Sequence, residues 1–230
     1  LVFKDTILGL AAGVRLTSND MLHKGDWITV KSVDANGIVE DMSLTTVKVR
    51  NFDNTIVTIS PATLVNGSFQ NWIGMQKSGG RRVKRIVYFD FRSIRLVDET
   101  LKQTLLAKHF ATEDSFKLKE SLQKAIEKDI QEGKDIEDLK NPAALAPTNL
   151  QLYRRFMEKY LRQRPEVNTE LTLMVRHMEA TQCGLPIEFY FFIKDKVWVN
   201  YEHILADIME HAYALANEFG LKIYEQYPEQ

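Results

Sequence analysis

The sequence predicts an α+β protein, on three observations. Residues 4–16 are mostly apolar and free of proline, which is typical of a helix. Between residues 25 and 59, apolar residues alternate with polar ones in short runs that turn residues separate, which is typical of strands. Beyond residue 80, the strand and helix patterns follow the order β-α-β-β-α-β once a charged helical insertion is set aside, which is the ferredoxin-like arrangement.

The composition limits the classes of protein that fit. A chain of 230 residues with 44% hydrophobic and 27% charged residues is ordinary globular material, and its length favours two domains. The net charge of -1 gives no global attraction to nucleic acid. The single cysteine, Cys183, excludes a disulfide framework and fits a reducing compartment.

The chain opens on Leu1 and has neither a signal-peptide pattern nor a run of about 20 apolar residues. We therefore interpret the chain as a fragment or processed form with no segment that spans a bilayer by itself.

The predicted first helix carries small residues on one face. Gly9 and Gly13 are four positions apart, with Ala12 beside them, so another backbone can approach this face closely. Glycine costs about 1 kcal/mol relative to alanine in a helix, which makes the face poorly suited to a soluble core. Two interpretations remain open: a helix built to pack against copies of itself, or a signal-anchor remnant or loosely packed terminal helix.

The alternating region predicts four or five short antiparallel strands. We expect strands that begin at Trp27 and Gly37, and strands over residues 44–50 and 55–59. Turns are expected at residues 33–37 and 51–54, and Pro61 should end the ladder. So many short strands in fewer than about 50 residues predict a small curled barrel whose closure hides the sheet edges.

The remaining residues predict the second domain. Gln76–Arg85 is interpreted as a basic hinge before a strand at residues 86–91, and Asp98 as the cap of a helix that reaches residue 110. Further helices are expected within 116–133 and at 150–161 and 199–219, the last ending at Gly220. Strands are expected at 169–177, 187–193 and 221–224. The stripe that predicts the charged helix consists of Leu118, Leu122, Ala125, Ile126 and Ile130.

No motif predicts catalysis, a cofactor or a metal, so we expect a protein that is not an enzyme. His203, Asp207 and His211 follow one another at i, i+4 and i+8, with Glu210 adjacent, but no HExxH pattern accompanies them. A solvated polar helix face explains this spacing better, and stoichiometric zinc in the purified protein would contradict that interpretation.

Nucleic-acid binding is the main alternative. A small β barrel followed by a basic cluster fits an RNA-binding protein, in which phosphates meet the cations and bases stack on aromatic rings. The cluster consists of Arg81, Arg82, Lys84 and Arg85, and the candidate stacking residues are Phe52, Phe69 and Trp72. Against this alternative, the cluster is one isolated patch in a chain of balanced charge.

Several motifs resemble the small-conductance mechanosensitive ion channel (MscS) family. They are Leu10–Val14, Lys24–Ile28, Gly37–Thr46, Val49–Asn54, Ile59–Ala62 and Asn71. The similarity is dense over residues 8–71 and weaker beyond, although Gly220–Ile223 also resembles the closing segment of the family. The charged insertion at about 96–165, with Lys77–Arg82, is similar to the miniconductance, YbdG-like branch.

The resemblance implies a domain organisation and a function. Residues 1–22 would be the end of a pore-lining transmembrane helix, 23–72 an Sm-like β barrel, and 73–230 a C-terminal α/β domain with the insertion. The chain would belong to a homoheptameric channel of the bacterial inner membrane, mostly on the cytoplasmic side. Membrane tension would open the pore and release ions and small solutes on hypoosmotic shock. Its partners would be copies of itself, lipid through upstream helices, and permeant solutes, with no nucleic acid.

The resemblance also implies roles for individual residues. Leu1, Lys4 and Asp5 would lie at the pore, and Gly9, Ala12 and Gly13 would pack helices together. The motif residues of the β domain would be Gly25, Asp26, Gly37, Asp53, Asn54 and Pro61. Two departures stand out: Ala62 follows Pro61 where the family commonly has asparagine, and the charged pair Lys4-Asp5 stands near the glycine hinge of the family.

Overall fold

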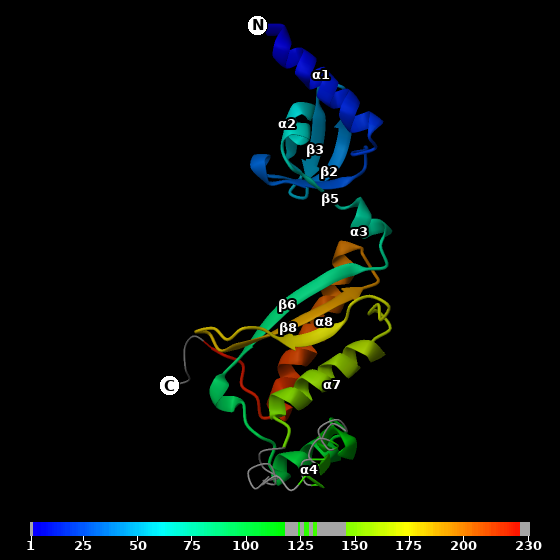
Figure 1. Cartoon of the computed structure of the whole chain (residues 1–230). Coiled ribbons are helices and arrows are strands. Elements are labelled where there is room, and N and C mark those ends of the chain that lie inside the picture. The colour runs from blue at the N-terminus through cyan, green and yellow to red at the C-terminus, as the bar shows by residue number, and fades with distance from the viewer. Residues whose placement is uncertain (1, 118–123, 125–126, 129–130, 133–145, 226–230) are drawn as a thin grey trace. The chain divides into compact units, whose positions relative to one another are not determined.

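The computed structural model describes residues 2–117, 124, 127–128, 131–132 and 146–225, with side chains from residue 7 onward. The chain divides into two compact units, residues 1–78 and 79–230 (Figure 1). Each unit has a hydrophobic core of its own. The boundary falls at Ser78-Gly79, six residues after the predicted end of the β domain.

The first unit begins with the predicted helix. Helix α1 spans Val2–Ser18, slightly longer than expected at both ends. Its second half packs on the unit, because Ala12, Gly13 and Leu16 are buried while the residues between them are exposed. The chain then leaves the helix through Asp20, which adopts a left-handed conformation at φ 56°.

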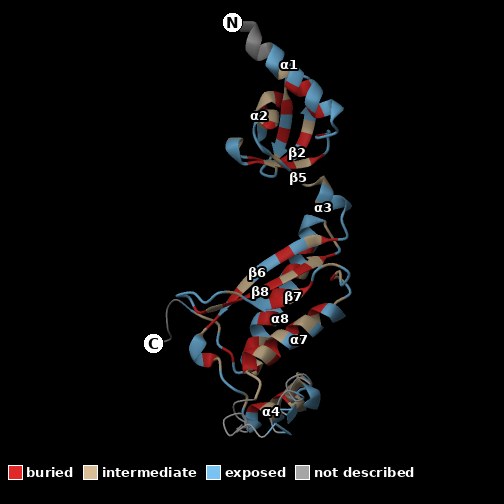
Figure 2. Ribbon diagram, in the orientation of Figure 1, coloured by how far each residue is buried: buried red, intermediate tan, exposed pale blue. Residues whose placement is uncertain are grey.

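Five strands form one antiparallel sheet in this unit. They are β1 (Trp27–Val30), β2 (Ala35–Met42), β3 (Val47–Asn51), β4 (Ile56–Ile59) and β5 (Gln70–Asn71), in the order β4-β3-β2-β1-β5. The predicted alternation is visible as buried and exposed residues in turn along β2 and β3 (Figure 2). The strand ladder has no pairing between β4 and β5 over residues 24–78, so closure into a barrel stays a prediction.

Three local features differ from the sequence prediction. The turn before β2 is shorter, because η1 (Lys31–Val33) and Asp34 at φ 52° complete it before Ala35. Pro61 does end the ladder, but it also opens a helix, α2 (Pro61–Asn66), whose first turn is capped by the Ser60 hydroxyl accepting from Thr63 N at 3.2 Å. Strand β5 and helix α3 (Ile73–Lys77) follow, and both are too short to leave a periodic pattern.

The second unit has the predicted ferredoxin-like topology. Its elements are β6 (Arg81–Phe89), α4 (Glu99–Ala107), α7 (Asn149–Gln163), β7 (Met174–His177), β8 (Leu185–Ile193) and α8 (Trp198–Glu218). Strand β8 lies between β6 and β7, and all pairings are antiparallel. Ile223 forms an antiparallel bridge to Phe89, which puts the last predicted strand beside β6. Across the sheet, the final segment therefore lies next to β6, followed by β8 and then β7. This is the strand order that the predicted β-α-β-β-α-β arrangement requires.

The basic stretch is where the prediction was wrong. Arg81–Arg85 is not a hinge but the first half of β6, paired residue by residue with β8. The guanidinium of Arg81 lies 4.2 Å from the ring centre of Tyr201, and the Tyr201 hydroxyl donates to Arg82 O. Only Ser78–Gly80 separates α3 from this strand.

Other predicted elements are present with shifted ends. Asp98 caps α4 as expected, but the helix ends at Ala107, and the strand expected from residue 169 begins at Met174. Two short 3-10 turns, η2 (Phe91–Ser93) and η3 (Glu113–Phe116), were not predicted. The stripe Leu118, Leu122, Ala125, Ile126 and Ile130 lies outside the described residues.

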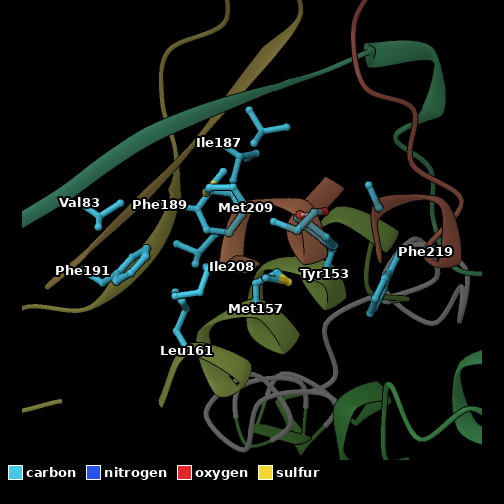
Figure 3. Close-up of a cluster of buried hydrophobic side chains, with 14 of the residues drawn as sticks. Val83, Tyr153, Met157, Leu161, Ile187, Phe189, Phe191, Ile208, Met209 and Phe219 are labelled. Carbon is cyan, nitrogen blue, oxygen red and sulfur yellow. Dashed lines mark hydrogen bonds between the residues drawn. The ribbon is translucent and has the colours of Figure 1, made fainter. Parts of the chain in front are cut away.

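Helices α7 and α8 cover one face of this sheet. Tyr153, Met157 and Leu161 of α7 meet the α8 side chains and the inward residues of β8 in one core (Figure 3). The buried Tyr153 hydroxyl donates to Ala212 O at 2.6 Å, and burial raises its pKa. Gly220, at φ 67°, ends α8 as predicted, with its N–H bonded to Asn217 O.

Candidate functional site

The candidate site is the junction between α1 and the β domain. Gly13 lies directly on the main chain of Leu44, in the loop between β2 and β3. A Cβ atom on residue 13 would stand 2.8 Å from the Leu44 carbonyl carbon and closer still to its oxygen. Only glycine fits there without a shift of backbone. Of the three small residues, Ala12 and Gly13 are thus buried within their own unit, whereas Gly9 has nothing within 4 Å of its Cβ position.

Helix α1 also exposes apolar residues. The exposed fractions are 64% for Ile7, 52% for Leu8, 45% for Leu10 and 51% for Val14. Among the described residues, no helix has the length and hydropathy that crossing a membrane requires. Leu1 lies outside the described residues. Lys4 and Asp5 fall in the first turns of α1, where only the backbone is described.

A buried carboxylate ties the end of α1 to the sheet. Asp26 is only 6% exposed, and its Oδ2 accepts from His23 N at 3.0 Å and from Asn71 Nδ2 at 2.8 Å. Asn71 also donates to Met21 O, so the loop that follows α1 is held to β5. Gly25 makes this turn at φ 94°, and its N–H donates to Val39 O at 2.8 Å.

The second motif shapes the turn between β3 and β4. A Cβ on Gly37 would lie 2.6 Å from the carbonyl carbon of Arg50, so glycine is needed where β2 pairs with the end of β3. Asp53 accepts from both the N–H and the hydroxyl of Thr55, and these bonds lower the pKa of Asp53. Asn54 takes the left-handed position at φ 67°. These motif residues therefore hold loops in place, and no nucleophile and base lie together among them.

Sequence reasoning missed an aromatic cluster on the β domain. The rings of Trp27 and Trp72 stack with centroids 4.6 Å apart, and Phe52 meets Trp27 edge-on at 5.3 Å. Trp72 also donates to the Thr29 hydroxyl. Phe52 and Trp72, two of the candidate stacking residues for RNA, thus both contact Trp27. The third, Phe69, packs against the hydrophobic core instead. The basic cluster of that alternative belongs to the other unit.

The candidate metal ligands lie along α8. His211 Nδ1 is 2.7 Å from the Asp207 carbonyl oxygen, and its ring stacks on Tyr160 with centroids 5.8 Å apart. Over the part of the chain that the structure describes, no three His, Cys, Asp or Glu side chains are placed to hold a metal ion together.

Comparison with known proteins gives a consistent result. The family model described as the mechanosensitive ion channel β-domain matches residues 5–74. The small-conductance mechanosensitive channel MscMJ of Methanocaldococcus jannaschii is 32% identical over 71 residues, which are 31% of this chain and 20% of that protein. An MscS family protein of Aquifex aeolicus is 33% identical over 88 residues, 38% of this chain and 23% of that protein. The matches span about a fifth of these relatives.

The fold extends the likeness to nearly the whole chain. Arabidopsis thaliana MSL1 superposes with a TM-score of 0.62 at 11% identity, covering 98% of this chain and 61% of that one. Helicobacter pylori MscS in its closed state superposes with a TM-score of 0.58 at 12% identity, covering 100% of this chain and 66% of that one. At such low identity these two show the fold alone. Residues 5–74 are thus similar to the β-domain of mechanosensitive ion channels, and the sequence relatives named above are MscS-family proteins.

Proposed function

We propose that this chain is part of a mechanosensitive ion channel subunit, in which membrane tension opens a homo-oligomeric pore. The observation that carries the proposal is α1. One side of this helix is fixed to the β domain through Gly13, and the other side exposes Ile7, Leu10 and Val14. An exposed apolar stripe of this kind marks a surface that another protein segment or lipid covers.

The pore would lie on the amino-terminal side of this junction. Leu1, Lys4 and Asp5 would stand at or near the conduction path, where rings of apolar side chains gate by excluding water. Tension would favour the wider state because that state occupies more membrane area, which shifts a population and requires no chemical step. Opening on hypoosmotic shock would release ions and small solutes.

Self-association would complete the pore. Gly9 is the small residue of α1 that the first unit leaves uncovered, so it is the position at which a neighbouring helix has room to approach. On the β domain, Ile38, Phe52 and Ile56 expose between 36% and 50% of their surface. We propose a heptamer in the bacterial inner membrane, with the β and α/β units on the cytoplasmic side and upstream helices in contact with lipid. The charged insertion favours the miniconductance branch.

The family is one of channels and not of enzymes, and the junction is a mechanical connection. Its loops are held by the hydrogen bond between Asp26 and Asn71 and by the close contact of Gly37 with Arg50.

Patch recording tests the proposal. The intact protein would be expressed in bacterial spheroplasts that lack their own mechanosensitive channels, and suction applied to excised patches. We expect discrete currents that appear above a threshold of tension, and better survival of hypoosmotic shock. Surface expression without any tension-activated current would overturn the proposal. If a labelled RNA oligomer instead bound the chain in a salt-dependent manner, the RNA-binding ring would replace it.

A further inference from the structure

The second unit contains a cavity that the channel proposal does not use. It has a volume of about 410 Å³ and is lined by residues of α7 and of the segment that follows α4. A cavity of this size falls in the range of small-molecule sites, roughly 300–1,000 Å³. Its lining residues are His109, Phe110, Ala111, Thr112, Ser115, Leu152, Arg155, Phe156, Lys159, Tyr160 and Gln163.

The floor of the cavity is aromatic. Phe110 and Phe156 meet edge-on with centroids 5.3 Å apart, and Phe219 of the core lies 5.7 Å from Phe156. Phe110 reaches this position because the chain turns at His109, which has φ 59°, and because Phe110 N donates to Leu105 O. Leu152 and Ala111 add apolar surface beside the two rings. The floor therefore suits a flat or branched apolar body.

The rim of the cavity is cationic. Arg155 and Lys159 stand four residues apart on α7, which puts them on one face, and both side chains are exposed. Neither forms an ion pair with a carboxylate of the described residues. Their charged neighbours are engaged elsewhere: Arg154 donates to Val175 O, and Glu158 accepts from Val175 N.

The acidic residues beside the cavity are also engaged. Glu113 pairs with Lys102 at 3.8 Å and Asp114 with Lys117 at 2.6 Å. No aspartate or glutamate is among the described residues that line the cavity. Within the described part of the chain, the charged lining thus consists of two cations that no carboxylate pairs with, together with His109, above an apolar floor, a combination that attracts negative charge.

From this geometry we propose that the cavity binds a small amphipathic organic anion, with a ring or branched chain on the Phe110–Phe156 floor and a phosphate or carboxylate held by Arg155 and Lys159. The guanidinium of Arg155 offers a planar fork that matches both anionic groups, and the Lys159 ammonium adds a second charge. Neither half of the ligand would suffice alone, because an inorganic anion leaves the floor unused and a neutral ring leaves the cations unpaired.

Calorimetric titration of the 230-residue chain with 1-naphthyl phosphate tests the proposal. We expect saturable binding at one site per chain, and binding at least tenfold weaker for 1-naphthol and for inorganic phosphate. Arg155→Ala with Lys159→Ala should weaken naphthyl phosphate binding by more than tenfold, since two charge-assisted contacts are lost. Arg162→Ala is the matched control, because Arg162 is an exposed cation of α7 that does not line the cavity, and it should leave the affinity within about twofold.

A second variant tests the floor independently of charge. Ala111→Leu keeps every cation and takes up cavity volume beside the rings, so it should weaken the binding of naphthyl phosphate while leaving that of inorganic phosphate unchanged. Unaltered thermal unfolding would show that each variant is folded. Equal affinity of the wild type and the double variant, equal binding of 1-naphthol, or equal binding of inorganic phosphate would each overturn the proposal. None of these measurements depends on channel activity.

Discussion

Gly13 of α1 rests on the main chain of Leu44, so closely that a methyl group at residue 13 would overlap the Leu44 carbonyl. This contact joins the amino-terminal helix to the loop between β2 and β3 within one chain. The Thr17 hydroxyl donates to Gly13 O at 3.0 Å and holds the adjacent turn. The small residues predicted on one face of the helix therefore differ in their contacts. Gly13 packs against Leu44 of its own unit, whereas nothing lies within 4 Å of the Cβ position of Gly9.

Substituting alanine for Gly13 and for Gly9 should change the stability of the first unit in opposite directions. We expect Gly13→Ala to lower the free energy of unfolding of the first unit by about 1–3 kcal/mol, because added volume in a packed site forces backbone shifts. Gly9→Ala should raise it by up to about 1 kcal/mol, since alanine favours the helix and meets nothing within 4 Å. Urea unfolding of the chain measures both. Equal losses in the two variants would contradict this difference in contacts.

Gly9 is accordingly the position that reports on packing between copies. Gly9→Leu in the intact protein should change the tension threshold in patch recordings, because the side chain would enter the space where a neighbouring helix approaches. The isolated chain should keep its stability. A bulky residue at Gly13 changes both quantities together, so it cannot separate contact between copies from the contact with Leu44. An unchanged threshold in Gly9→Leu would argue against helix packing at this position.

Asp26 and Asn71 should act as a pair. Asp26→Ala leaves the amide of Asn71 and the N–H of His23 without their buried acceptor, and we expect a loss of about 1–3 kcal/mol. Adding Asn71→Ala should cost less than the sum of the single losses. A double-mutant cycle in urea then gives a coupling energy of at least about 0.5 kcal/mol, and strict additivity would show that the two side chains are independent.

The sequence predicted the elements whose patterns are long or repeated. Helix α1, strands β1–β4 and the β-α-β-β-α-β order follow from periodicity and turn residues. The sequence did not predict α2, α3 or β5, because elements of two to six residues are too short to show a periodic hydrophobic pattern. The glycines Gly79-Gly80 and the four cations that follow are typical of a hinge, whereas pairing with β8 makes Arg81–Arg85 part of a strand. The contact of Gly13 with Leu44 joins residues 31 positions apart, so no local sequence pattern could predict it.

Glu188 is a carboxylate in the middle of β8 that is 0% exposed. Its Oε2 accepts from Arg176 Nε at 2.7 Å, whereas Lys84 Nζ lies 3.6 Å from Oε1, so the two cations tie β7 and β6 to the central strand. Both cations are about half exposed. Removing the carboxylate leaves them in contact with water, whereas removing Arg176 leaves a buried charge poorly paired.

The cost of substitution should therefore be unequal. We expect Arg176→Ala to destabilise the second unit by about 3 kcal/mol and Glu188→Gln by roughly 1–2 kcal/mol. Arg162→Ala, on the exposed side of α7, serves as the control and should be nearly neutral. Thermal unfolding measures all three. A larger loss for Glu188→Gln than for Arg176→Ala would contradict the assignment of the carboxylate as the group that depends on its partner.

The turn between β3 and β4 should make the stability of the first unit depend on pH. The hydrogen bonds from Thr55 lower the pKa of Asp53 below its ordinary 3.8, so the folded state binds this proton less readily than the unfolded chain does. The contribution is then fully present above pH 3.8 and is lost as pH falls through the lowered pKa. Thr55→Val removes the hydroxyl donor, which contributes most to this shift, and keeps the N–H. At pH 6 the wild type should be more stable than Thr55→Val, and this difference in stability should shrink as pH falls below 3.8. A difference that grows towards low pH would contradict this account of Asp53.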